Sequence, residues 1–242
     1  MEKKLDEVIY HVERISRTTD KLSRSLASLD SSCVPNSSPA DEYFDALGSG
    51  KKEWRLVFRA TAYNNVLVYP AYIYGTGIPT QVEAGCKQFN HSLPCMNHYR
   101  NRQAIENWGN VDEVLFAIYV KDQLVKYIIF NGRGSTFTDW FEGNRVIVSS
   151  WNDLKTLTHN IFSIEGDSRS QIMRRFLVNH HYEGCSKDKG WFLVTDLLPG
   201  ICPYEVQLAS PGFVYSKGNR VALLSSQDVA WADAVGIYLK YN

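Results

Sequence analysis

Residues 5–29 carry the most regular pattern of apolar and polar positions in the chain. Apolar side chains recur there at spacings of three and four, no Gly or Pro interrupts the run, and Thr19 is its one polar member. Charged residues occupy the outer positions, so the pattern predicts an α-helical coiled coil over residues 1–30. The seam positions are Leu5, Val8, Val12, Ile15, Thr19, Leu22, Leu26 and Leu29.

β-branched residues at one seam of this helix favour a trimer. Val8 and Ile15 occupy the second seam position, where they disfavour a parallel dimer, and Ile9 widens the apolar strip. We therefore expect a homo-oligomer, with a trimer favoured. The alternative is a single amphipathic helix packed on its own domain, because an ordinary helical period fits the same apolar series.

Residues 31–52 follow neither a helical nor a strand period and are rich in Ser, Pro, Gly and Asp. This composition predicts a flexible linker between the helix and a globular head over residues 53–242. From residue 53 onward, short runs of β-branched and aromatic residues alternate with turn residues, which predicts strands. The expected strands cover residues 53–62, 66–75, 113–120, 124–131, 144–150, 160–166, 174–182, 190–196, 212–216, 220–226 and 234–242.

The strand pattern indicates the fold class of the head. Two of the runs flank a polar turn at Lys121, Asp122 and Gln123, which predicts a hairpin. Helical segments are short, at residues 101–107 and 151–156, where Ser150 is in position to cap the second. Short strands without alternating helices predict a mostly β head, an antiparallel sandwich or jelly-roll with short helices. The alternative is an α+β head with a central mixed sheet.

Charge and hydropathy argue against two classes of partner. The chain has 26 basic and 26 acidic residues and a formal net charge of +0, whereas a nucleic-acid partner requires a basic surface. No apolar run reaches the roughly 18 residues that a membrane-spanning helix needs, so we expect no membrane span. Met1 leads into a charged helical pattern rather than a secretory signal, so the chain is either cytosolic or a secreted protein whose signal segment is absent from this chain.

Five cysteines predict two small disulfide loops and one leftover thiol. Cys86 and Cys95 would close the first loop, and Cys185 and Cys202 the second. Cys33 lies just past the last heptad, where an interchain disulfide would join parallel helices. The spacing of a zinc ribbon or a thioredoxin-type site does not occur.

Two Asn-x-Ser sequences are acceptors for N-linked glycan, which is added only outside the cytosol. Asn36 lies in the expected linker, and Asn90 lies inside the first cysteine loop. Together with the pairable cysteines, these acceptors favour a secreted, extracellular glycoprotein.

The sequence contains no motif that identifies a reaction. It lacks the Gly-x-Ser-x-Gly turn, the phosphate loop and the His-Glu-x-x-His helix of well-known enzyme classes. His180 and His181 would point to opposite faces of a strand, so we expect no metal there. No cofactor is therefore expected, and calcium is the alternative, because loops contain the carboxylates Asp139, Glu142, Glu165, Asp167, Asp188 and Asp196.

Aromatic and amide-rich loops predict a sugar-binding surface. Amides and acids hydrogen-bond to sugar hydroxyls, and an aromatic face packs on the C–H side of a sugar ring. The alternative is that the tryptophans belong to the core. The predicted ligand-binding residues are Asn97, His98, Arg100, Asn101, Trp108, Asp139 and Trp140.

A coiled-coil neck, a cysteine after it and a disulfide-bearing β head together resemble the layout of oligomeric pattern-recognition lectins. The head lacks the motifs of the fibrinogen-like and C-type lectin families, so the resemblance assigns no binding residue. The function we expect is lectin-like recognition of glycans or glycoproteins by multivalent heads. The alternatives are a secreted hydrolase that uses Asp188 with His180 or His181, and a structural matrix or egg-coat protein.

Overall fold

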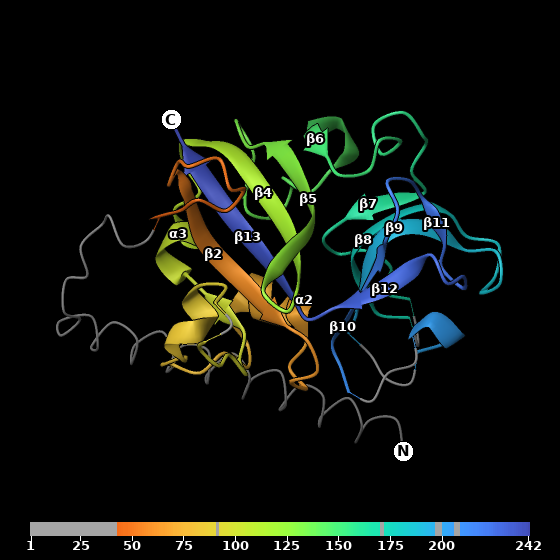
Figure 1. The fold of residues 1–242 in the computed structure, drawn as a ribbon, viewed down its shortest axis with the longest axis horizontal. Coiled ribbons are helices and arrows are strands. Elements are labelled where there is room, and N and C mark those ends of the chain that lie inside the picture. The colour runs from red at the N-terminus through yellow and green to blue at the C-terminus, as the bar shows by residue number, and fades with distance from the viewer. Residues whose placement is uncertain (1–42, 91, 170–171, 197–199, 206–208) are drawn as a thin grey trace, which may run out of the picture. The chain divides into compact units, whose positions relative to one another are not determined.

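The computed structural model describes residues 43–90, 92–169, 172–196, 200–205 and 209–242, and their strands form two antiparallel sheets (Figure 1). These residues belong to the unit Glu42–Asn242. The mostly β, antiparallel character predicted for the head is confirmed, and helices are few within this part of the chain. The predicted coiled coil, Cys33 and Asn36 lie outside the described residues.

Sheet A is built around four long strands. β2, β13, β4 and β5 lie side by side in that order, β1 and β6 form the edges, and β3 also pairs with β2. The predicted hairpin is confirmed: Lys121 and Asp122 form the turn between β4 and β5, and both have the positive φ of hairpin turns. The strands of sheet A are β1 (Tyr43–Phe44), β2 (Trp54–Thr61), β3 (Tyr99–Arg100), β4 (Val111–Val120), β5 (Gln123–Asn131), β6 (Val146–Ser149) and β13 (Ala234–Tyr241).

Sheet B has the strand order β12-β10-β9-β8-β7, and β11 also pairs with β9. The chain passes from sheet B to sheet A at Asp233, the one residue between β12 and β13 (Figure 1). The Asp233 carboxylate accepts a hydrogen bond from the backbone N–H of Lys121 at 2.6 Å, which fixes this crossing point to the β4–β5 turn. The strands of sheet B are β7 (Ile161–Ser163), β8 (Arg174–His181), β9 (Lys189–Thr195), β10 (Gly212–Ser216), β11 (Ala222–Leu223) and β12 (Val229–Ala232).

An aromatic core lies between the two sheets. Phe116 of β4 contacts Phe176 of β8 and Phe192 of β9, with ring centroids 5.9 Å and 5.0 Å apart. Trp140 and Phe141, from the loop between β5 and β6, also pack against Phe116. Because side chains from both sheets share one buried cluster, the sheets form a sandwich.

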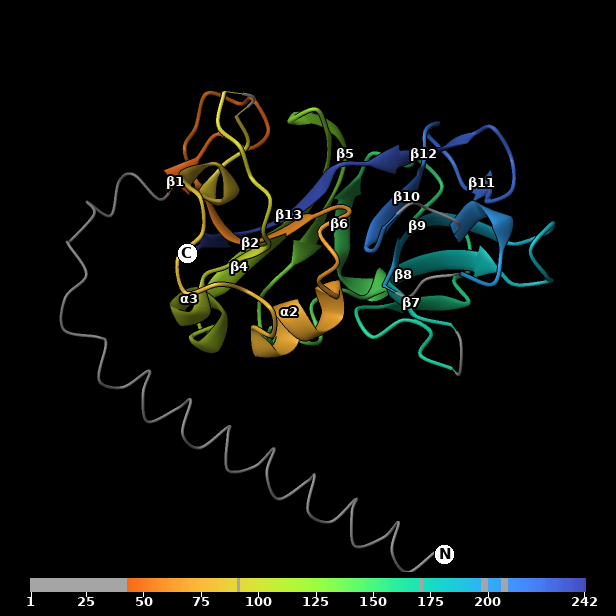
Figure 2. The ribbon, with the colours of Figure 1, turned by 90° about the horizontal axis from the view of Figure 1, so that it is seen from below.

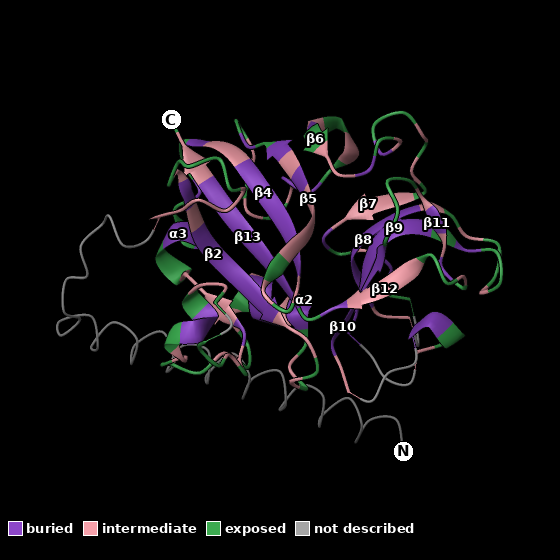
Figure 3. Cartoon of the chain, viewed as in Figure 1, coloured by how far each residue is buried: buried purple, intermediate pink, exposed green. Residues whose placement is uncertain are grey.

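Each sheet is also covered on its outer face, which explains the continuous apolar runs of the central strands. On β4, Val114 and Phe116 belong to the inner core, whereas Leu115 and Tyr119 belong to a second cluster that is covered by Phe89. Neighbouring side chains point to opposite faces of a strand, so a strand buried on both faces is apolar throughout. Figure 3 shows β2, β13 and β4 buried along most of their length.

The prediction of a strand over residues 66–75 is wrong, because these residues contain the helix α2 (Val68–Tyr74). Its buried positions recur at helical spacing, and Gly75 ends it in the left-handed conformation with its N–H bonded to the carbonyl oxygen of Ala71. At the other end, the Asp196 carboxylate accepts hydrogen bonds from the N–H groups of Val68 and Tyr69, at 2.8 Å and 3.0 Å. Figure 2 shows α2 beside the region where the two sheets meet.

Two other sequence predictions differ from the structure. The helix predicted at residues 101–107 is present as α3 (Arg102–Glu106). The helix predicted at residues 151–156 is wrong, because these residues form turns. Ser150 accepts a hydrogen bond from the backbone N–H of Tyr127 in β5 instead of capping a helix. The Asp153 carboxylate accepts a hydrogen bond from the indole of Trp191 at 2.8 Å, which ties these turns to sheet B. Within the predicted linker, Tyr43–Phe44 pairs with β2 as the edge strand β1.

Candidate functional site

An open cavity lies on sheet B where β8 ends and β9 begins. Its volume is about 450 Å³, within the size range of small-molecule sites in proteins. Strand β8, the loop from β8 to β9, the first residue of β9 and strand β11 all contribute to its lining. We call it the β8–β9 cavity, and its lining residues are His180, His181, Glu183, Ser186, Lys187, Lys189 and Leu223.

A bulge in β8 brings two consecutive histidines to this cavity. Asn179 pairs with Gly190 of β9 and His181 pairs with Lys189, so His180 is an extra residue in the ladder. The two imidazole rings lie with their centroids 6.4 Å apart, and both line the cavity. The expectation that they point to opposite faces is therefore wrong, because it assumed a regular strand.

Backbone and aromatic contacts fix the orientation of the His180 ring. Its Nδ1 lies 2.7 Å from the carbonyl oxygen of Thr158. A carbonyl oxygen only accepts, so Nδ1 carries the proton and Nε2 keeps the lone pair of the neutral ring. The ring also packs edge-on to Trp191, with centroids 6.1 Å apart. His180 therefore presents one defined nitrogen for a ligand.

The other polar side chains of the cavity differ in how far they are paired. Glu183 Oε2 lies 3.4 Å from His181 Nε2 and 3.7 Å from Lys187 Nζ, so this carboxylate has two basic neighbours. The side chains of Ser186 and Lys189 form no hydrogen bond or ion pair with the described residues. A hydroxyl and an ammonium group thus remain for a ligand.

A buried carboxylate and a disulfide hold the loop from β8 to β9 in place. The buried Asp188 carboxylate accepts hydrogen bonds from the backbone N–H of Glu183 at 3.0 Å and from the hydroxyl of Tyr204 at 2.6 Å. The predicted disulfide between Cys185 and Cys202 is confirmed and links the same loop to the segment that contains Tyr204. The lining residues of the loop are thereby fixed by covalent and buried polar contacts.

A buried arginine completes the support of this loop. Arg174 donates two hydrogen bonds to Glu205, at 2.6 Å and 2.8 Å, and lies 3.7 Å from the carboxylate of Asp188. Its guanidinium also packs over the rings of Tyr182 and Tyr204. Burial alone would lower the pKa of Arg174, but the hydrogen bonds to Glu205 and the neighbouring tyrosine oxygens raise it overall. The group therefore stays charged and neutralises the buried carboxylates.

This arrangement does not assemble the histidine and aspartate of the hydrolase hypothesis. Asp188 is only 3% exposed and does not line the cavity. The Nδ1 atom of His180 bonds to a backbone carbonyl, and His181 contacts the exposed Glu183. A buried carboxylate that orients a catalytic histidine is absent from the described lining residues. The chemistry that the cavity offers is hydrogen bonding and charge.

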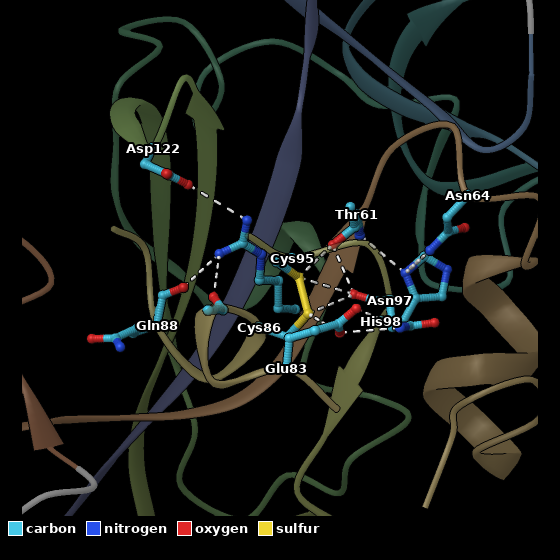
Figure 4. The surroundings of a disulfide bond; sticks show 11 residues. Thr61, Asn64, Glu83, Cys86, Gln88, Cys95, Asn97, His98 and Asp122 are labelled. Atoms are coloured by element: carbon cyan, nitrogen blue, oxygen red, sulfur yellow. Dashed lines mark hydrogen bonds and ion pairs between the residues drawn. A yellow bond between two sulfur atoms is a disulfide. The ribbon is translucent and has the colours of Figure 1, made fainter. Parts of the chain in front are cut away.

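The ligand-binding residues predicted from the sequence do not line this cavity. His98 is buried, and its Nδ1 accepts a hydrogen bond from the N–H of Thr61 at 3.0 Å (Figure 4). Its Nε2 donates to the carbonyl oxygen of Val66 at 2.9 Å. Asn97 donates to the carboxylate of Glu83 at 3.0 Å. Both side chains are engaged within the head.

The side chains of Arg100 and Asn101 form hydrogen bonds with backbone groups at the ends of α2 and α3. Arg100 Nε donates to the carbonyl oxygen of Tyr72 at 2.7 Å, near the C-terminal end of α2. Asn101 accepts a hydrogen bond from the N–H of Ala104 at 3.0 Å and caps α3. These contacts satisfy helix ends that would otherwise lack partners.

Trp108 and Trp140 are buried and stack with ring centroids 6.3 Å apart. Their indole N–H groups donate to the hydroxyls of Ser135 and Tyr72. Asp139 accepts a backbone hydrogen bond within its own turn at 2.7 Å. Ligand binding by these seven residues stays a prediction, and the contacts of their side chains stabilise the fold.

The first cysteine loop is a surface excursion held to sheet A. The predicted disulfide between Cys86 and Cys95 is confirmed. Arg59 donates hydrogen bonds to the carbonyl oxygens of Gly85, just before the loop, and of Gln88 within it, and its guanidinium lies 4.2 Å from the ring centre of Phe89. Asn90 is exposed, so its amide is accessible for the predicted glycosylation.

The lining residues that the sequence did not predict are Glu183, Ser186, Lys187, Lys189 and Leu223. Residues 186–189 follow Cys185 and lie between the strands expected over residues 174–182 and 190–196. The available signal was a histidine pair followed by a cysteine and then by two lysines, Lys187 and Lys189. Leu223 had no local signal, because strand pairing alone places it opposite Lys189.

Among the described residues, no three His, Cys, Asp or Glu side chains gather closely enough to hold a metal ion. In the same part of the chain, helices are too short or too polar to cross a membrane. Comparison of the chain with family models, curated proteins and solved structures finds no match.

Proposed function

We propose that the chain is an extracellular binding protein that recognises glycans in the β8–β9 cavity. The observation that carries the proposal is a cavity of about 450 Å³ that is lined by hydroxyl, imidazole, ammonium and carboxylate groups from β8, from β9 and from the fixed loop between them. Sugar hydroxyls require such a mixture of donors and acceptors, and Leu223 offers an apolar contact for the C–H face of a ring. Two disulfides support an extracellular location.

The proposed mode of action is reversible binding by several heads. A shallow, open cavity gives each head a weak site, and several linked heads raise the overall affinity for a surface that displays many copies of the ligand. The linkage is the coiled coil predicted over residues 1–30. Binding of the full chain to a glycan array should therefore depend on its oligomerisation.

Blocking the cavity with a bulky side chain tests the proposal. We expect the full chain to bind a defined subset of glycans on an array and Ser186→Trp to lose that binding, because the indole fills the cavity. Ser168→Trp is the matched control, since Ser168 is an exposed serine in the loop between β7 and β8, outside the cavity. Equal thermal stability of the two variants would exclude unfolding as the cause.

Two outcomes would contradict the proposal. If the full chain binds no glycan on a broad array, glycan recognition is wrong and a structural matrix role is favoured. If Ser186→Trp binds as well as the unmodified chain, the ligand lies elsewhere on the head.

A further inference from the structure

We propose that the β8–β9 cavity selects glycans that carry an acidic group, either a sulfate or a carboxylate. This inference rests on the glycan binding proposed above and adds the chemical class of the ligand. The anionic group would contact the lysines of the cavity, while the remaining sugar contacts the histidines and Leu223.

The lysines of the cavity carry more charge than its one carboxylate offsets. Glu183 lies 3.7 Å from the ammonium group of Lys187. Lys189 forms no ion pair with the described residues. An ammonium group offers three hydrogen-bond donors, and such bonds are strongest to an ionised oxygen. The cavity is therefore complementary to one negative charge.

Strand pairing fixes where Lys189 emerges. Lys189 pairs with His181 on one side and with Leu223 on the other. Side chains of directly paired residues lie close together on a sheet, so a ligand that reaches the ammonium group also meets an imidazole and an apolar side chain. An acidic sugar presents these same three features, namely an anionic substituent, hydroxyls and an apolar ring face.

The charge beneath the cavity does not cancel this preference. Asp188 is buried, and its carboxylate is occupied by the Tyr204 hydroxyl, by a backbone N–H and by Arg174 at 3.7 Å. The whole chain has a formal net charge of +0, so it lacks the excess of basic groups that binding of a long polyanion requires. A short acidic saccharide is thus favoured over a nucleic acid or an extended polyanion.

An array of matched saccharides tests the inference. Each saccharide is presented in neutral, sulfated and uronic-acid forms on the same carrier, and the full chain is the analyte. We expect an acidic form to bind at least about tenfold more tightly than its neutral form, the size of one charge-assisted hydrogen bond. Raising the salt concentration should reduce this ratio, because added ions screen the exposed charges.

Paired lysine variants locate the effect. Lys187→Gln with Lys189→Gln should remove the preference for acidic forms, whereas Lys51→Gln with Lys52→Gln should keep it. Both pairs are exposed and remove the same charge, but the second pair lies between β1 and β2 of sheet A. Arginine at positions 187 and 189 should preserve the preference, which shows that the loop still folds.

The outcomes separate this inference from the proposed function. Equal binding of neutral and acidic forms would overturn the inference and leave glycan recognition intact. Absence of binding to every form would overturn both. An equal loss in the two lysine pairs would overturn the inference as well, because overall charge rather than the cavity would then explain the preference.

Discussion

His98 and Asp196 are buried groups with opposite pKa shifts, and each contributes its own pH dependence to stability. Burial lowers the pKa of His98 from 6.5 to about 4, although the hydrogen bond to Val66 opposes this effect. The folded state thus favours the neutral ring. Stability that His98 contributes is present above the ordinary histidine range and is lost as the pH falls from 6.5 towards 4.

Asp196 acts in the opposite direction. Burial raises its pKa from 3.8 to about 6, although the N–H groups of Tyr69 and Val68 and the charge of Arg175 favour the ionised form. The folded state therefore binds a proton at Asp196 more tightly than the unfolded state does. Its contribution to the free energy of unfolding increases as the pH falls through about 6 towards 3.8.

The two contributions nearly offset each other in the unmodified chain, and single variants should separate them. Each pKa unit corresponds to about 1.4 kcal/mol. Lowering the pH from about 7 to about 4.5 then costs about 2.5 kcal/mol through His98 and contributes about 2 kcal/mol through Asp196. Relative to the unmodified chain, His98→Gln should gain stability over this range and Asp196→Asn should lose it.

Urea unfolding at the two pH values measures these differences. The change between pH values is compared for each variant and the unmodified chain, so the offset that each substitution causes at neutral pH cancels. The remaining carboxylates titrate equally in the variants and in the unmodified chain, so their contribution to the difference also cancels. A His98→Gln difference that stays constant with pH would refute the neutral, buried state of this histidine, and the same result for Asp196→Asn would refute its raised pKa.

Three further perturbations test the support of the site and the assembly. Glu205→Gln should lower the free energy of unfolding by about 3 kcal/mol, measured with urea, because it leaves Arg174 as a buried charge with a weaker partner. Replacing Cys185 and Cys202 by Ser should cost about 3 kcal/mol in the chain-entropy model and weaken glycan binding by loosening the loop, measured by non-reducing unfolding and array binding. Sedimentation should show the full chain as an oligomer, with a trimer favoured, and a chain beginning at Glu42 as a monomer; equal masses would contradict assembly through residues 1–30.

Local signals in the sequence were sufficient for much of the fold. The apolar runs of β4 and β5 flank a two-residue polar turn, and such a hairpin forms between neighbours in sequence. Both disulfides join cysteines less than 20 residues apart, with separations of 9 and 17, so proximity along the chain favoured the correct pairs. Strand pairing that involves only adjacent segments was predictable for the same reason.

Long-range contacts decided the features that the sequence reasoning missed. The aromatic and β-branched residues of α2 are typical of a strand, yet Asp196, which is 128 residues from Val68, satisfies the start of the helix. The β8–β9 cavity depends on a bulge at His180 and on the pairing of Leu223 with Lys189. Neither the bulge nor the pairing of Leu223 with Lys189 produces a periodic pattern in the sequence.

The buried charges under the loop from β8 to β9 are explained better by positioning than by stability. A buried ion pair loses so much hydration energy that apolar residues of the same volume stabilise a core equally well. The pair formed by Arg174 and Glu205 nevertheless occupies the interior, and beside it Asp188 bonds to the backbone N–H of Glu183. Only a charged or polar group could make that bond, and an exposed loop gains little order from apolar contacts. The network therefore fixes the residues that face the cavity, and the cost of burying it is offset by a site that is ordered before a ligand arrives.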